Sequence, residues 1–153
     1  MRRADRQITD RAQIDAIIRQ SRVCRLGLVR DGEPYVVPLC FGYDGDAVYL
    51  HMAAAGAKLD ALRAHPRVCL EWDEPGPVLP ADAACGWGMA YRSVIAYGVA
   101  VELTDQEAKR RALALIMAQY AGERRAWSFP DAQLGRTVVV WVRLDVVTGK
   151  ARG

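Results

Sequence analysis

The sequence predicts a mainly β fold, in which six antiparallel strands form a barrel and helices pack on its outside. Two observations support this prediction: the tight turns between successive strands and the number of short strand-like segments. Turns containing Asp-Gly at 31–32 and 44–46 join the first three strands, which predicts an antiparallel meander. The predicted strands, rich in β-branched and aromatic residues, are 23–30, 35–43, 47–52, 67–73, 90–103 and 136–147.

Three helices are predicted from capping signals and helical periodicity. Residues 10–13 and 104–107 each have the form of a capping box, which marks the start of a helix. Pro66 ends the middle helix because proline cannot continue the backbone hydrogen bonding. The predicted helices are 10–21, 57–65 and 104–121.

Two interruptions of the strand pattern carry further predictions. Residues 75–89 contain three prolines and several glycines, which predicts an irregular loop that acts as a lid over a binding site. Trp87 in this loop and Trp141 in the last strand are candidates for walls of that site, but a tryptophan in a strand is more often a core residue, so Trp141 is left without a role. Gly98, inside the fifth strand, is expected to mark a bulge or a close approach of two backbones.

Length and composition describe one domain, residues 1–153, and exclude several classes of function. The net charge is only +3 and the arginines are scattered, so no nucleic-acid partner is expected. No apolar run approaches the roughly 18 residues of a membrane span. The cysteines at 24, 40, 69 and 85 are widely spaced, which predicts a reduced, cytoplasmic protein without a metal site.

Several predicted strands are apolar on both faces, so the outside of the barrel needs a cover. Residues 35–41, 94–99 and 138–142 are nearly continuous hydrophobic runs. We predict a homodimer that buries one barrel wall against another. A helix lying over the wall is the alternative.

A lysine at the start of the second helix indicates an anion site. The strand at 47–52 is followed by the small residues 53–56 and then by this helix. Lys58 lies in its first turn, where a cation costs a few tenths to about 1 kcal/mol against the helix dipole. An anion held by the free backbone N–H groups and the ammonium removes that cost. We predict a phosphate site at Lys58, with His51 upstream; the alternative is a solvated surface lysine.

Five segments, taken together, resemble the flavin-binding split-barrel superfamily that includes pyridoxamine 5′-phosphate oxidase. They are YVVPLCFGY at 35–43, VYLH at 48–51, GAKLDAL at 56–62, AYRSVIAYGVA at 90–100 and RTVVVWVRLDVVTGK at 136–150. Their order and spacing are most similar to the nitroimidazole-resistance (Nim-type) flavoproteins, over nearly the whole chain. The resemblance implies a six-stranded split β-barrel that forms a homodimer and binds FMN at the subunit interface.

The first two segments of this resemblance imply roles for four residues. Val37, Pro38 and Leu39 match the strand that runs along the flavin ring, where backbone groups address its polar edge. For Pro38 the alternative is an ordinary edge-strand proline. His51 matches a strand-end histidine that lies near the flavin ring and the substrate, where it contacts the cofactor and donates a proton to the substrate or orients a substrate oxygen. The alternative is a partly buried histidine bonded to a backbone carbonyl.

The later segments imply four more contacts with the cofactor. Lys58 matches the family's basic residue at the flavin phosphate, the site already inferred from its position in the helix. Tyr91, Arg92 and Ser93 match a step close to the cofactor, where Arg92 binds phosphate or places positive charge near the ring. A surface ion pair is the alternative for Arg92. The chain stops at Gly153 without an extended basic region, so vitamin B6 oxidation is not expected.

These implications predict an FMN-dependent oxidoreductase. It would reduce a small acceptor, such as a nitroaromatic, with electrons from transiently bound NADH or NADPH. One alternative is that the same barrel binds a deazaflavin or haem, which an absorption spectrum distinguishes from FMN. Another alternative is a non-enzymatic flavin-binding sensor or carrier. In that case neither NADH nor NADPH would reduce the bound FMN.

Overall fold

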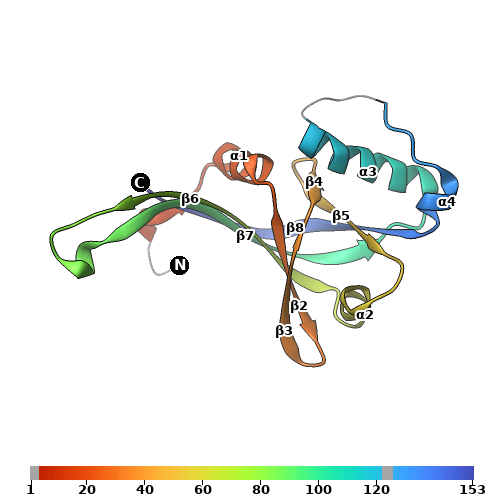
Figure 1. Cartoon of the computed structure of the whole chain (residues 1–153), viewed down its shortest axis with the longest axis horizontal. Helices are drawn as coiled ribbons and strands as arrows, with labels where there is room; N and C mark the ends of the chain where they lie inside the picture. Colours follow the sequence, from red (N-terminus) through yellow and green to blue (C-terminus); the bar gives the residue numbers. More distant parts are fainter. Residues whose placement is uncertain (1–3, 122–125) are drawn as a thin grey trace.

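One antiparallel sheet, folded into a split barrel, forms the centre of the molecule (Figure 1). The structure is a computed structural model and describes residues 4–121 and 126–153. The prediction of a mainly β barrel with flanking helices is confirmed. The strands are β1 (Gln7–Ile8), β2 (Cys24–Arg30), β3 (Glu33–Leu39), β4 (Phe41–Tyr43), β5 (Ala47–Ala53), β6 (Arg67–Leu79), β7 (Gly88–Glu102) and β8 (Thr137–Arg152). The helices are α1 (Arg11–Gln20), α2 (Ala57–Ala64), α3 (Gln106–Ala121) and α4 (Asp131–Leu134), with 3₁₀ turns η1 (Ala4–Arg6) and η2 (Ala84–Gly86).

The barrel is split because one stretch of chain contributes to both ends of the sheet. The strand order is β3-β2-β6-β7-β8-β5-β4, and β1 pairs with β8. β3 pairs with β2, but the chain breaks its strand at Cys40 and β4 pairs with β5. The predicted strand at 35–43 was therefore wrong as one strand, and the predicted meander is two separate hairpins. With β1 added, the described sheet has eight strands instead of six.

The first turn and the cap of α1 form where the sequence predicts them. The cap of α3 lies one residue later than the predicted capping box at 104–107, because Asp105 and not Thr104 caps the helix. Asp31 and Gly32 have φ values of 53° and 82°, so both adopt the left-handed conformation that a tight hairpin turn requires. The Asp10 carboxylate accepts a hydrogen bond of 2.9 Å from the first turn of α1. At α3 the Asp105 carboxylate accepts from the N–H of Ala108 at 2.7 Å. Local side-chain chemistry thus sets these boundaries.

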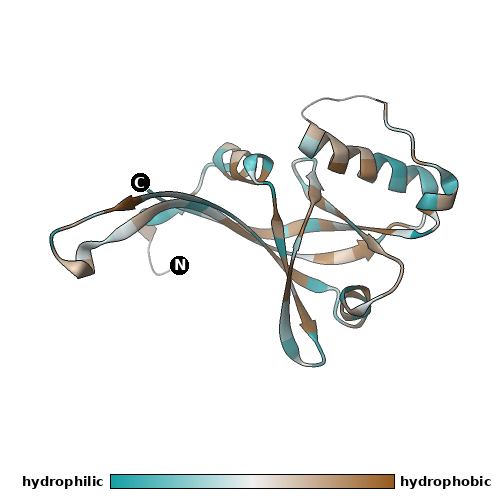
Figure 2. Ribbon diagram, in the orientation of Figure 1, coloured by the Kyte–Doolittle hydropathy of each residue, from teal (hydrophilic) through white to brown (hydrophobic). Residues whose placement is uncertain are grey.

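The barrel strands share one hydrophobic core with α1 and α2. Ile17 and Ile18 of α1 and Leu59 of α2 are buried in it. Near its centre, Trp72 packs edge to face on Phe41, with ring centroids 5.8 Å apart. Figure 2 shows hydrophobic residues recurring along the strands that enclose this core. α3 lies instead on β4 and β5.

The segment predicted to be an irregular loop is a long β-hairpin that projects from the barrel (Figure 1). β6 continues to Leu79 and β7 begins at Gly88, which leaves only residues 80–87 between the two strands. The sheet register shifts between Pro75 and Val78. Such an irregularity tolerates prolines because the residues within it need not donate backbone hydrogen bonds to the neighbouring strand. We call residues 75–90 the arm; it extends away from its own barrel and does not cover it.

Two glycines of the sheet are explained by close packing. The last strand continues through Gly149 to Arg152, beyond the predicted end at 147. A Cβ at Gly149 would lie 3.0 Å from the Cβ of Ile8, so glycine there serves packing and not a turn. The prediction for Gly98 is confirmed, since the β7–β8 register shifts there and a Cβ would collide with the backbone carbonyl of Arg143.

The outer face of β7 and β8 carries Arg143, opposite Val99, and five apolar side chains that are 40–49% exposed. We call these five the wall: Ile95, Tyr97, Val99, Val101 and Val146. No described helix is both long enough and apolar enough to cross a bilayer.

Candidate functional site

Two adjoining cavities, which we call the pocket, lie where β3, β5 and the N-terminus of α2 meet. The larger cavity has a volume of about 420 Å³, and its lining includes Pro38, Leu39, His51 and Lys58. The smaller, of about 270 Å³, includes Val37 and again Lys58. Small-molecule sites typically measure roughly 300–1,000 Å³. The fold thus brings five of the predicted site residues to one ligand-sized space.

Within residues 4–121 and 126–153, Lys58 is a cation without a counter-ion at the start of α2. The helix begins after Gly56, whose φ of 124° strongly favours glycine and whose position lacks a side-chain cap. The N–H groups of Leu59 and Asp60 donate to the Gly56 carbonyl at 2.9 and 3.2 Å. Among the described residues, the N–H groups of Ala57 and Lys58 have no acceptor and the Lys58 ammonium has no carboxylate partner. Desolvation lowers the pKa of Lys58. An anion bound at this end of the helix would offset that cost and accept hydrogen bonds from the N–H groups of Ala57 and Lys58.

His51 lies on β5 with its side chain exposed in the larger cavity. Its ring makes no hydrogen bond to any residue in 4–121 or 126–153, so the alternative of a histidine bonded to a backbone carbonyl is not observed. Desolvation, followed by the charge of Lys58, lowers the pKa of His51. At neutral pH the ring is therefore uncharged and offers one N–H donor and one nitrogen acceptor.

β3 borders the pocket as an edge strand. It stands at one end of the strand order and pairs only with β2, where Pro38 lies opposite Arg25. Half of the backbone groups of such a strand have no partner in the sheet. Pro38 is thus an edge-strand proline, as its alternative interpretation held, and it also lines the pocket. Unpaired backbone groups beside a cavity suit a ligand with a polar edge.

Tyr91, Arg92 and Ser93 lie on β7 at the base of the arm, and none of them lines either cavity. The Arg92 guanidinium pairs with the Glu74 carboxylate and donates to Gln20 Oε1 at 3.1 Å. The surface ion pair named as the alternative for Arg92 is therefore present. Within one chain, the structure does not bring these three residues to the other predicted site residues.

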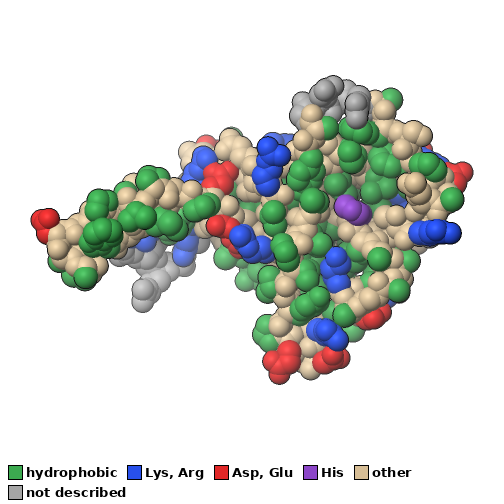
Figure 3. Space-filling view, viewed as in Figure 1, with side chains coloured by type: hydrophobic (Ala, Val, Ile, Leu, Met, Phe, Trp, Pro, Cys, Tyr) green, Lys and Arg blue, Asp and Glu red, His purple; other side chains and the backbone are tan. Residues whose placement is uncertain are grey.

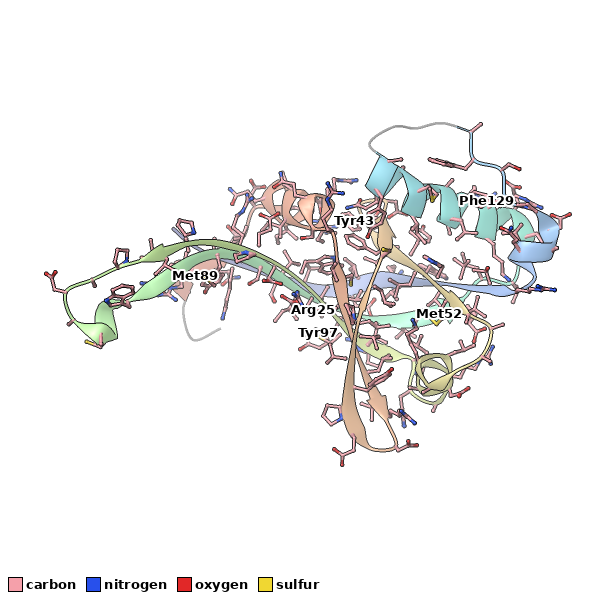
Figure 4. All side chains as sticks on the ribbon, in the orientation of Figure 1. Arg25, Tyr43, Met52, Met89, Tyr97 and Phe129 are labelled. Atoms are coloured by element: carbon pink, nitrogen blue, oxygen red, sulfur yellow. The ribbon has the colours of Figure 1, made fainter. Side chains whose placement is uncertain are left out.

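Sequence reasoning missed several residues of the pocket. Arg136 and Cys40 both line the larger cavity, and Met52 lines both cavities (Figure 4). Arg136 is a second cation there, and its side chain forms no ion pair within the described residues. Its placement follows from the β5–β8 pairing, in which Thr137 lies opposite Ala53. No local sequence pattern marks such a position.

A separate hollow of about 400 Å³ lies between α3 and the outer face of β5 and β8. Trp141, which the sequence left without a role, lines it together with Tyr49 and Arg111. The Tyr49 hydroxyl donates to the Asp44 carboxylate at 2.7 Å. This hollow shares no lining residue with the pocket. No cluster of His, Cys, Asp or Glu in the described parts of the chain is arranged to hold a metal ion.

Comparisons with known proteins agree with this fold. A family model described as pyridoxamine 5′-phosphate oxidase matches residues 10–151. A candidate 5-nitroimidazole antibiotic resistance protein from Bacteroides thetaiotaomicron is 32% identical with a TM-score of 0.85, covering 95% of this chain and 86% of that one. The flavocytochrome Anf3 from Azotobacter vinelandii has 24% identity and a TM-score of 0.89, covering 100% and 72% of the two chains. An FAD and heme binding protein from Mycobacterium smegmatis has 24% identity and a TM-score of 0.85, covering 97% and 74%. The last two share the fold.

A curated protein also matches part of the chain. An uncharacterized protein from Rhizobium meliloti (strain 1021) is 28% identical over 65 residues. That match spans 42% of this chain and 42% of the relative's length. It therefore concerns less than half of either protein.

Proposed function

This chain belongs to the pyridoxamine 5′-phosphate oxidase family, and from that premise we propose that its pocket binds FMN and that the protein is an FMN-dependent oxidoreductase. The proposed reaction oxidises NADH or NADPH and reduces a small acceptor such as a nitroaromatic. Two relatives support the choice of chemistry: one is described as a candidate 5-nitroimidazole resistance protein and another as binding FAD and heme. An absorption spectrum of the purified protein separates FMN from a deazaflavin or haem.

The observation that carries this proposal is the unpaired cation at the start of α2. In the part of the chain that the structure describes, the Lys58 ammonium and the N–H groups of Ala57 and Lys58 have no partner and lie at the edge of the pocket, where together they would hold one anion. A flavin mononucleotide carries one terminal phosphate, which matches one such site. The edge strand β3, with Val37, Pro38 and Leu39, then lies beside the remainder of the cofactor.

The residues of the pocket have distinct tasks in this proposal. FMN, when bound, supplies the hydride-transfer chemistry. Lys58 holds the phosphate, and the backbone of β3 orients the polar edge of the ring. The neutral His51 ring donates its N–H to an oxygen of the acceptor and so positions it.

We also propose that the working unit is a homodimer in the cytoplasm. The exposed, apolar wall supports a dimer, because an isologous contact would bury the same patch on both subunits. Tyr91, Arg92 and Ser93 line neither cavity of the pocket in their own chain, so in this proposal they contact a cofactor bound in the pocket only from a second copy. The four cysteines of the chain form no disulfide, which favours a reducing compartment.

The phosphate site is tested by comparing FMN with riboflavin, which lacks the phosphate. Lys58→Ala should weaken FMN binding by about 10- to 150-fold, since a hydrogen bond to a charged group contributes about 1.5–3 kcal/mol. Riboflavin affinity should change little. Quenching of flavin fluorescence on titration into the cofactor-free protein measures both dissociation constants.

Arg63→Ala is the matched control for this experiment. It removes one cation from the same helix, but Arg63 pairs with Glu102 and lines neither cavity. Its FMN affinity should stay close to that of the unmodified protein. If Lys58→Ala lost equal affinity for FMN and for riboflavin, the assignment of the phosphate to Lys58 would be wrong. A protein that binds no flavin at all would end the proposal.

A further inference from the structure

The larger cavity of the pocket contains a cation that the phosphate site does not need. Arg136 is exposed just before β8 and lines this cavity together with His51. Within residues 4–121 and 126–153, its guanidinium forms no ion pair and donates no hydrogen bond. The acid at the start of α4, Asp131, pairs with Arg110 instead. A guanidinium is always charged, and its fork of N–H donors fits the two oxygens of a carboxylate.

The two cavities separate this cation from the phosphate site. Ala57, whose N–H group belongs to that site, lines only the smaller cavity, whereas Arg136 lines only the larger one. No aspartate or glutamate of the described chain lines either cavity. Figure 3 shows Lys or Arg side chains on two sides of a histidine on this face, with no acidic side chain between them. A flavin phosphate at Lys58 therefore leaves Arg136 for a second anion.

The sheet register spaces Arg136 and His51 for a small ligand. His51 lies opposite Val139, which is three residues, or about 10 Å, from Arg136 along the chain. Two side chains with this spacing can contact opposite ends of one substituted ring, with the long arginine side chain adjusting the reach. Lys109 adds positive charge nearby, because its ammonium donates to the Thr137 carbonyl at 3.1 Å. The larger cavity thus has a neutral donor at His51 and a cationic end at Arg136.

We propose that Arg136 binds a carboxylate of the acceptor, so that the preferred substrates are small aromatic acids such as a nitrobenzoate. A carboxylate suits this position because it is planar, accepts two parallel N–H bonds and balances one cation with one charge. This inference rests on the proposed function and adds the substrate class to it. One NADH and one proton reduce the nitro group to a nitroso group, and NAD⁺ and water are the other products. The carboxylate is unchanged, so it contributes binding and orientation.

The first test measures binding without turnover, by isothermal titration of the purified protein with benzoate and with its neutral analogue benzamide. Arg136→Ala should weaken benzoate binding by about 10- to 150-fold and leave benzamide affinity unchanged. Arg136→Lys should recover only part of the loss, because an ammonium lacks the planar fork. Arg111→Ala is the matched control, since Arg111 is also exposed but pairs with Glu107 and lines the separate hollow. Its benzoate affinity should equal that of the unmodified protein.

The second test is kinetic and compares 4-nitrobenzoate with its methyl ester. Arg136→Ala should raise KM for the acid by a similar factor and leave kcat/KM for the ester unchanged.

Four outcomes decide the inference. Equal affinities of the unmodified protein for benzoate and benzamide would overturn it, and so would a loss of benzoate binding in Arg111→Ala alone. If Arg136→Ala weakened FMN or FAD binding but not benzoate binding, Arg136 would be a phosphate ligand and the inference would be wrong. Benzoate binding through Arg136 in a protein that takes up no flavin would support the carboxylate site and remove the proposed flavin chemistry.

Discussion

Gly42 on β4 is a position where a single added methyl group should press directly on the backbone of α3. A Cβ there would lie 2.7 Å from the Ile116 nitrogen and 2.9 Å from the Leu115 carbonyl carbon. Both are backbone atoms of α3, so the helix itself must move. Overpacking of this kind costs about 1–3 kcal/mol. Gly42 is not among the glycines with positive φ, so the effect is one of space alone.

Moving α3 also weakens its polar contact with the barrel. The Tyr120 hydroxyl accepts from the N–H of Phe41 at 3.0 Å and donates to the Arg22 carbonyl at 3.0 Å. Each such bond contributes about 0.5–1.5 kcal/mol. We therefore expect Gly42→Ala to lower the free energy of unfolding by about 2–4 kcal/mol.

Urea unfolding followed by circular dichroism measures this change as a lower midpoint with an unchanged slope. Gly27→Ala is the matched control, because its Cβ would lie at ordinary contact distances of 3.4 and 3.5 Å from Cys69. Gly27→Ala should be close to neutral or slightly stabilising, since glycine weakens a strand interior. Equal midpoints for Gly42→Ala and the unmodified protein would refute the steric argument.

Three further predictions concern the titratable residues His51 and Tyr43. Because desolvation and the charge of Lys58 lower the pKa of His51, Lys58→Met should raise the midpoint of the His51 ring resonance in an NMR pH titration. His51→Ala should lower turnover at unchanged FMN content, and normal turnover would return His51 to a structural role. Burial, followed by the hydrogen bond to Asp15, raises the pKa of Tyr43 to about 12, against roughly 10 in an unfolded chain. Between these values the unfolded chain binds fewer protons, so the free energy of unfolding should fall as pH rises from 10 to 12. Tyr43→Phe should make that fall less steep, and an identical slope by urea titration would contradict the assignment.

Local features of the chain were predictable, because a few neighbouring residues determine them. The hairpin turn at 31–32, the cap at Asp10 and the packing at Gly98 all appear as expected. The family resemblance is confirmed by the match over residues 10–151. The gathering of His51 and Lys58 in one cavity follows from their closeness along β5 and α2. A phosphate at Lys58 remains a prediction.

Features that depend on distant pairing were not predictable. Nothing at Cys40 signals that the strand at 35–43 changes partner, because the break is imposed by closure of the barrel. The prolines of 75–89 suggested an irregular loop, whereas β6 accommodates two of them at a register shift. Gly149 looked like the end of a strand, but its small size allows Ile8 to approach. Arg136 reaches the pocket only through the register of β8 on β5.

The open edge of β3 has a consequence for the protein in the absence of ligand. A row of unpaired donors and acceptors on Val37 and its neighbours is a template on which a foreign strand can add. Pro38 interrupts that row by removing one donor, which makes the edge a poorer template. A flat heterocycle bound against β3 would cover the remaining unpaired donors and acceptors and keep a foreign strand from pairing with them. Loss of the ligand should then shorten the shelf life of the protein through fibrillar or amorphous aggregation well before the barrel unfolds.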